Sequence, residues 1–105
     1  MKQINKLVRD RIPEIIEAAG EIPVTRILDP NEYQVRLEAK LDEEVREFHE
    51  SKDPEELPDI LEVVYALAEA QGCSKQELLE HYDQKHTSRG GFSGRVFLIE
   101  KTQIK

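Results

Sequence analysis

The sequence predicts an all-α protein, an antiparallel bundle of about four helices with one or two short extended segments, which we expect oligomerisation to complete. Apolar residues recur at three- and four-residue spacing through most of the chain. Helix start signals precede three of these stretches, and glycines follow three of them. The 105 residues contain no polar linker or shift in composition, so we expect a single domain over residues 1–105.

The N-terminal part predicts one helix and one extended segment. Pro13 suits the first turn of a helix, and Gly20 can end it in a left-handed cap. The apolar residues with helical spacing in this region are Val8, Ile12, Ile15, Ile16 and Ala19. The β-branched stretch from Val24 to Leu28 then predicts a short strand or an extended connector.

A second helix is predicted to start at Asp29, which caps a first turn containing Pro30 and Glu32. Its apolar positions are Tyr33, Leu37, Leu41, Val45 and Phe48. A short turn around Ser51 should join it to the next helix, so we expect the two to pack as an antiparallel hairpin.

The third helix repeats the start signal with Asp53 and Pro54, and Gly72 is its stop. Its apolar positions are Leu57, Ile60, Leu61, Val64, Leu67 and Ala68. Pro58 lies just past the first turn and removes a backbone donor, which predicts a distortion or a later helix start there.

A fourth helix is predicted from the capping box of Ser74 and Glu77 to about Arg89, before a glycine pair. It carries Leu78, Leu79 and Tyr82. The stretch from Val96 to Ile99 predicts a short strand.

Composition and charge disfavour several classes of function. Twenty-two acidic against fifteen basic residues give a net charge of -7, and no stripe of Lys or Arg is present to bind nucleic acid. The longest apolar run, residues 60–70, is too short to cross a membrane. The N-terminus lacks the features of a secretory signal, and Cys73 alone can form no internal disulfide, so we expect a cytoplasmic protein.

Four carboxylates lie on or at the edge of the apolar sides of the second and third predicted helices. In helical projection Glu44 falls between Tyr33 and Leu37, with Glu47 just outside that arc. Glu56 projects onto the apolar side of the third helix, with Asp59 at its border. An ionised carboxylate against a core is costly unless a partner compensates its charge, and a bound cation is the simplest partner.

The spacing of the four acids favours one shared ion. Glu44 with Glu47 and Glu56 with Asp59 are i, i+3 pairs, equidistant from the turn between the helices. An oxygen-only cage of this kind suits Mg²⁺, with Mn²⁺ as an alternative. The competing interpretation is that these acids are solvated surface charges. A di-iron site is disfavoured because no histidine follows a glutamate at Glu-x-x-His spacing.

Two acidic motifs carry a family resemblance. Glu43-Glu44-Val45-Arg46-Glu47 and Glu56-Leu57-Pro58-Asp59 resemble the E-E-x-x-E and E-x-x-D signature of the MazG-like, all-α nucleoside triphosphate pyrophosphohydrolases. The block Asn5–Pro13 and the sequence Arg89-Gly90-Gly91-Phe92 resemble the phosphoribosyl-ATP pyrophosphohydrolase-like branch. The resemblance implies magnesium-dependent cleavage between the α- and β-phosphates of a nucleotide, releasing a monophosphate and pyrophosphate.

The resemblance also implies roles for single residues. The metal ligands would be Glu44, Glu47, Glu56 and Asp59. Glu44 or Glu47 would accept the proton of the attacking water, and Glu43 would support them or position the water. It further implies a homodimer or homotetramer, because two helices cannot enclose a nucleotide.

Five residues are candidates for substrate binding: Asn5, Arg9, Lys40, Lys85 and Arg89. Lys40 can instead pair with Glu44 one turn away. Lys85 and Arg89 can instead interact with the dipole of the fourth helix. Two other functions stay open: phosphoribosyl-ATP pyrophosphohydrolase in histidine biosynthesis, and a non-catalytic acidic interaction module.

Overall fold

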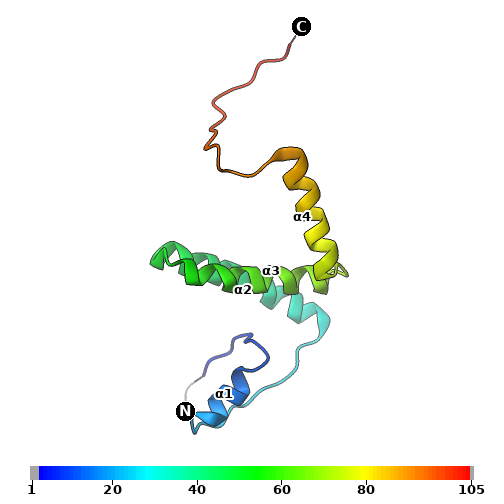
Figure 1. Cartoon of the computed structure of the whole chain (residues 1–105). Helices are drawn as coiled ribbons and strands as arrows, with labels where there is room; N and C mark the ends of the chain where they lie inside the picture. Colours follow the sequence, from blue (N-terminus) through cyan, green and yellow to red (C-terminus); the bar gives the residue numbers. More distant parts are fainter. Residues whose placement is uncertain (1–2, 105) are drawn as a thin grey trace.

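The computed structural model describes residues 3–104, and helices are its regular structure (Figure 1). The elements in order are α1 (Ile12–Ala18), α2 (Pro30–Ser51), the short 3-10 helix η1 (Pro54–Glu56), α3 (Leu57–Ala70) and α4 (Lys75–Arg89). No strand occurs among these described residues. The predicted all-α class is therefore confirmed.

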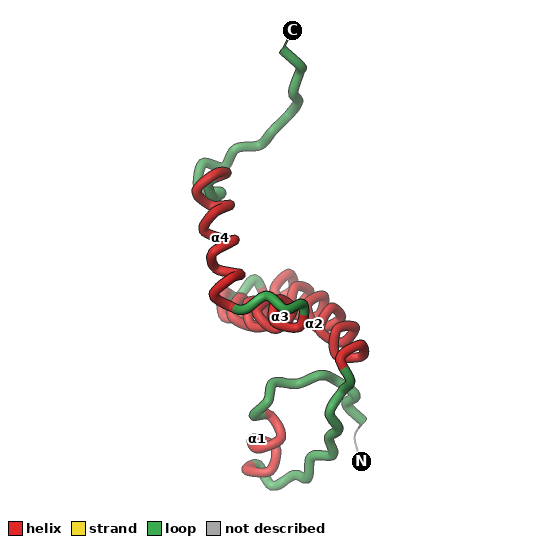
Figure 2. Tube along the Cα trace, turned by 90° about the vertical axis from the view of Figure 1, so that its right-hand side faces the viewer, coloured by secondary structure: helices red, strands yellow, loops and turns green. Residues whose placement is uncertain are grey.

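The strand predicted over residues 96–99 is wrong, whereas residues 24–28 follow the connector alternative of their prediction. Residues 24–28 form a connector between α1 and α2, which is the other alternative that the sequence allows, and residues 96–99 follow α4 as an irregular tail (Figure 2). A strand needs a second strand to satisfy its backbone donors and acceptors. Within residues 3–104 neither segment has one, so β-branched composition alone did not produce a strand.

Helix α1 begins at Ile12, four residues later than the apolar spacing from Val8 allows. Pro13 lies in its first turn. A start at Val8 would place this proline inside the helix, where it has no N–H to donate and its ring clashes with the preceding turn. Residues 6–9 therefore lie outside α1, and ion pairs join Lys6 to α2 and Arg9 to α3.

Helices α2 and α3 pack side by side and form the centre of the molecule. The Asp29 carboxylate accepts the Glu32 N–H at 2.9 Å and starts α2. After α2 ends, Asp53 accepts the Glu55 N–H at 2.9 Å and starts η1. The distortion predicted at Pro58 is confirmed, because a 3-10 turn precedes α3 and Pro58 lies in the first turn of α3.

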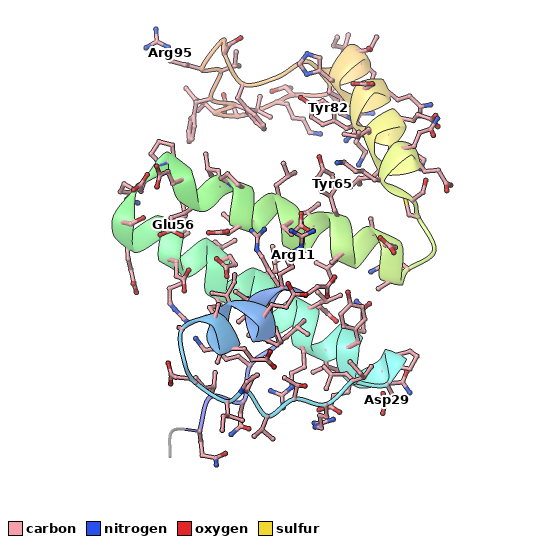
Figure 3. The ribbon with its side chains drawn as sticks, turned by 60° about the horizontal axis from the view of Figure 1, so that its bottom comes forward. Arg11, Asp29, Glu56, Tyr65, Tyr82 and Arg95 are labelled. Carbon is pink, nitrogen blue, oxygen red and sulfur yellow. The ribbon has the colours of Figure 1, made fainter. Side chains whose placement is uncertain are left out.

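The capping box of α4 is confirmed. The Ser74 hydroxyl accepts the Glu77 N–H at 3.1 Å, and the Glu77 carboxylate accepts the Ser74 N–H at 3.3 Å. Helix α4 packs against α3 alone among the helices, and Figure 3 shows Tyr65 of α3 on the side that faces α4. The Lys75 ammonium of α4 lies 4.6 Å from the centre of the Tyr65 ring. It ends at Arg89, as predicted.

The packed interior of this chain is small. Among residues 3–104 the buried apolar residues are Leu37 on α2 and Val63 on α3, and the principal extents are 68 × 32 × 20 Å. None of the helices in residues 3–104 combines the length and apolar character needed to cross a bilayer. The third buried residue is a carboxylate, Glu44 on α2.

Candidate metal centre

Glu44 is the most unusual side chain of the helix pair. It is 7% exposed, and its Oε1 lies 3.4 Å from the Lys40 ammonium one turn earlier. Its Oε2 is buried and has no hydrogen-bond partner among the described residues. A buried acceptor without a donor is costly, more so when it carries charge. The placement of Glu44 on the apolar side of α2, predicted from helical projection, is thus what the structure shows.

The acidic side chains form two overlapping groups that share Glu44. One carboxylate oxygen from each of Glu44, Glu56 and Asp59 lies within 4.8 Å of the others. Glu43, Glu44 and Glu47 form a second group by the same measure. The first group joins α2 to the end of η1 and the first turn of α3, whereas the second lies on α2 alone.

The structure therefore divides the four predicted ligands. Glu44, Glu56 and Asp59 come together across the helix pair, and Glu47 joins Glu44 from the same helix. The donor set consists of carboxylate oxygens from separate elements, with an unpartnered buried oxygen at the shared residue. This set fits a hard divalent cation such as Mg²⁺.

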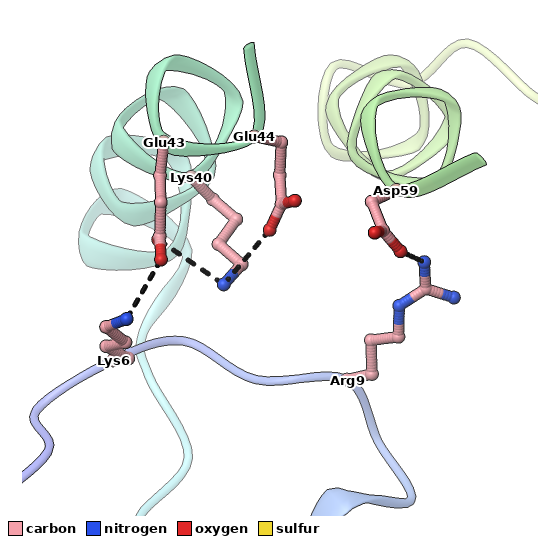
Figure 4. Close-up of polar contacts among 6 residues, drawn as sticks. All are labelled: Lys6, Arg9, Lys40, Glu43, Glu44 and Asp59. Atoms are coloured by element: carbon pink, nitrogen blue, oxygen red, sulfur yellow. Dashed lines mark hydrogen bonds and ion pairs between the residues drawn. The ribbon is translucent and has the colours of Figure 1, made fainter. Parts of the chain in front are cut away.

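Three basic side chains pair with Glu43, Glu44 and Asp59 (Figure 4). The Lys6 ammonium lies 2.9 Å from Glu43, and the Arg9 guanidinium lies 2.6 Å from Asp59. The Lys40 ammonium lies 3.4 Å from Glu43 as well as from Glu44. Lys40 thus makes the ion pair with Glu44 that was the alternative to a substrate role.

Sequence reasoning missed Lys6. It stands three residues before Arg9 in the same N-terminal block, and this spacing was the available signal. A partner 37 residues away, Glu43, becomes visible only when the chain is folded. The neighbouring Asn5 is exposed and has a left-handed backbone with φ of 51°.

The two candidates on α4 are not brought to the acids. Lys85 and Arg89 lie in the last turns of α4, which packs on α3 and does not reach α2. Figure 1 shows α4 running away from the helix pair. Within this single chain, the site therefore lacks the contribution expected of Lys85 and Arg89.

The pKa values of the neighbouring Glu43 and Glu44 are shifted in opposite directions. Burial, followed by the nearby charge of Glu47, raises the pKa of Glu44, and Lys40 only partly opposes this. The hydrogen bond from Lys6, aided by Lys40, lowers the pKa of Glu43. The same hydrogen bond raises the pKa of Lys6. Adjacent carboxylates thus differ because one is desolvated and the other is paired.

Glu44 should make the metal-free protein less stable as the pH rises. Its folded pKa is raised above its unfolded value, so its contribution to stability is complete below the unfolded pKa and is lost as the pH rises through the folded pKa. Glu43 has the opposite sign, because its lowered pKa contributes stability above the unfolded pKa. Carbon-detected NMR titration of both carboxyls should find Glu44 titrating at the higher pH; equal midpoints would contradict this order.

A shallow groove adjoins Glu44. It measures about 180 Å³ and is lined by residues of α2, of α3 and of the segment before α1. Pockets that enclose small ligands usually measure about 300 to 1,000 Å³. The groove beside Glu44 is therefore smaller than a usual small-ligand pocket.

Comparison with known proteins adds little about function. No family model and no solved structure matches the chain. A stretch of 43 residues, 41% of the chain, is 62% identical to an uncharacterised protein of Mycolicibacterium smegmatis (strain ATCC 700084 / mc(2)155). The match spans 44% of that protein's length, so less than half of either chain is covered.

Proposed function

We propose that this chain is a magnesium-dependent nucleotide pyrophosphohydrolase of the MazG-like type. The observation that carries the proposal is the buried Glu44 carboxylate, whose Oε2 has no partner within residues 3–104 and which lies beside Glu56 and Asp59. A divalent cation between these oxygens would supply the missing partner and offset the cost of burying the charge.

The local charge supports one divalent ion. The two acidic groups contain five carboxylates, and three basic side chains pair with them. The excess of two negative charges equals the charge of one Mg²⁺. An acidic surface repels phosphate unless such an ion reverses the local sign.

In this proposal some residues bind the metal, and others accept a proton or contact the substrate. Glu44, Glu56 and Asp59 hold the ion, with Glu47 next to Glu44 on α2. When bound, Mg²⁺ supplies neutralisation of the phosphate oxygens and activation of water. Glu44 or Glu47 would accept the proton of the water, and Lys40, once the ion takes its place beside Glu44, would contact a phosphate oxygen.

We also propose that two or more copies complete an antiparallel bundle. The radius of gyration is 18.8 Å, whereas a compact chain of about 100 residues measures about 13 Å. Leu57 and Leu61, one turn apart on α3, are both nearly half exposed. A homodimer or homotetramer would bury this face and enlarge the groove into a pocket.

The decisive experiment follows pyrophosphate release while Mg²⁺ is titrated against a panel of ribo- and deoxynucleoside triphosphates and phosphoribosyl-ATP. Release is expected only with the metal, and Asp59→Asn should reduce it at least about tenfold because a ligand is lost. Asp83→Asn, which removes the same charge from an exposed position on α4, is the matched control and should leave release unchanged.

The same panel separates the alternatives. Much faster turnover of phosphoribosyl-ATP than of any nucleoside triphosphate would assign the protein to histidine biosynthesis. Absence of release from every substrate by folded protein would favour a non-catalytic acidic interaction module. Full activity of Asp59→Asn would contradict the proposed ligand set.

A further inference from the structure

The segment before α1 lies across the candidate metal centre. We call residues Lys6–Asp10 the basic strap, after the two cations that anchor it. Lys6 pairs with Glu43 on α2, and Arg9 pairs with Asp59 on α3 (Figure 4). Leu7 and Val8, between these anchors, line the groove beside Glu44. The strap therefore bridges both helices that carry the acids.

Lys6 and Arg9 pair with carboxylates of different acidic groups. Glu43 shares one group with Glu44, and Asp59 shares the other. The Lys6 and Arg9 side chains are 54% and 53% exposed, so water competes with both ion pairs. Anchors of this kind neutralise the carboxylates but hold them weakly, and a divalent ion can take their place.

We propose that Lys6 and Arg9 are phosphate-binding residues that exchange partners when the metal binds. Without metal they neutralise Glu43 and Asp59. With a divalent ion on the carboxylates, the two cations turn to the phosphate groups of the substrate, on the same side of the groove as Lys40. This inference rests on the proposed function and adds Lys6 to Arg9, which the sequence already indicates as a candidate for substrate binding.

The placement of charge supports the exchange. A triphosphate requires several cations, yet Lys85 and Arg89 are carried away from the acids by α4. The described basic side chains that form ion pairs with the acidic groups are Lys6, Arg9 and Lys40. Since Lys40 also pairs with Glu43 and Glu44, the strap is the part of this chain that brings further positive charge to the groove.

The test measures metal binding and phosphate binding separately, by calorimetry. Mn²⁺ alone is titrated into wild type and Lys6→Gln, and then pyrophosphate is titrated into each protein in the presence of Mn²⁺. Lys6→Gln should bind Mn²⁺ about two- to fivefold more tightly, the factor for losing one competing exposed ion pair. It should bind pyrophosphate more weakly than wild type. Arg9→Gln should show the same two opposite changes.

Arg26→Gln is the matched control. Arg26 also pairs with a glutamate, at 2.7 Å from Glu32, and its loss changes the net charge equally, but it lies outside both acidic groups. It should leave both affinities at the wild-type values. Lys6→Arg, which keeps the charge, should restore pyrophosphate binding, and circular dichroism should show equal helix content in all variants.

Two outcomes would overturn the inference in different ways. If wild type binds Mn²⁺ but Lys6→Gln binds it equally or less tightly, the strap is only a structural clamp and the proposed function survives. Unchanged pyrophosphate binding by Lys6→Gln would have the same meaning. If wild type binds no Mn²⁺ at millimolar concentration, the proposed function fails together with this inference.

Discussion

Replacing Glu44 by Gln should stabilise the metal-free protein and abolish its response to magnesium. The substitution keeps the shape of the side chain but removes a buried charge whose Oε2 has no partner among residues 3–104. It also removes the repulsion by Glu47 that helps to raise the pKa of Glu44. We expect a gain of about 1 kcal/mol in the free energy of unfolding without metal.

Glu44→Gln should also weaken metal binding and slow pyrophosphate release. Glu44 is the residue common to both acidic groups, so its loss weakens either arrangement of ligands. Pyrophosphate release should fall at least about 100-fold, and added Mg²⁺ should no longer raise the melting temperature. Thermal unfolding with and without Mg²⁺, beside the release assay, measures both effects on the same protein sample.

Glu50→Gln provides the comparison, because Glu50 is an exposed glutamate of the same helix outside both acidic groups. It should change neither the metal-free stability nor the magnesium response. A destabilised Glu44→Gln that still gains stability from Mg²⁺ would show that Glu44 has a structural role and that the ion binds elsewhere.

Local signals explain which parts of the fold are predictable from sequence. The caps at Asp29, Asp53 and Ser74 act through hydrogen bonds to residues two or three positions away, so sequence alone reveals them. Strands depend on a partner elsewhere in the chain. That is why residues 96–99 form no strand although their composition predicts one, and why residues 24–28 form the connector rather than the strand that their composition also allows.

The sequence likewise predicts the parts of the candidate site that depend on regular helix geometry, and not the contacts between distant residues. Helical projection placed Glu44 on the buried side because α2 is regular along its length. The projection of Glu56 assumed an α-helix, but Glu56 is the last residue of a 3-10 turn, which rotates each residue differently. Counting equal numbers of residues on either side of the turn predicts that all four acids meet. In the structure, Glu47 belongs to a different acidic group from Glu56 and Asp59. The pairing of Lys6 with Glu43 depends on tertiary structure.

Replacing Leu61 by Glu should dissociate the proposed oligomer and lower its stability. Leu61 is 48% exposed in the single chain, one turn from the similarly exposed Leu57. Only Leu37 and Val63 are buried apolar residues among those described, so one copy has little core to hold α2 and α3 together. Burying a leucine contributes about 1.5 to 3 kcal/mol per copy, and a charge there would remove that contribution.

For wild type, sedimentation velocity should therefore detect a dimer or tetramer at micromolar concentration, and the melting temperature should rise with protein concentration. Leu61→Glu should sediment as a monomer with reduced helix content. Val24→Glu makes the same apolar-to-acidic change in the exposed connector before α2, and it should preserve the wild-type oligomer. A wild-type monomer with a concentration-independent melting temperature would mean that the α2–α3 pair is stable alone.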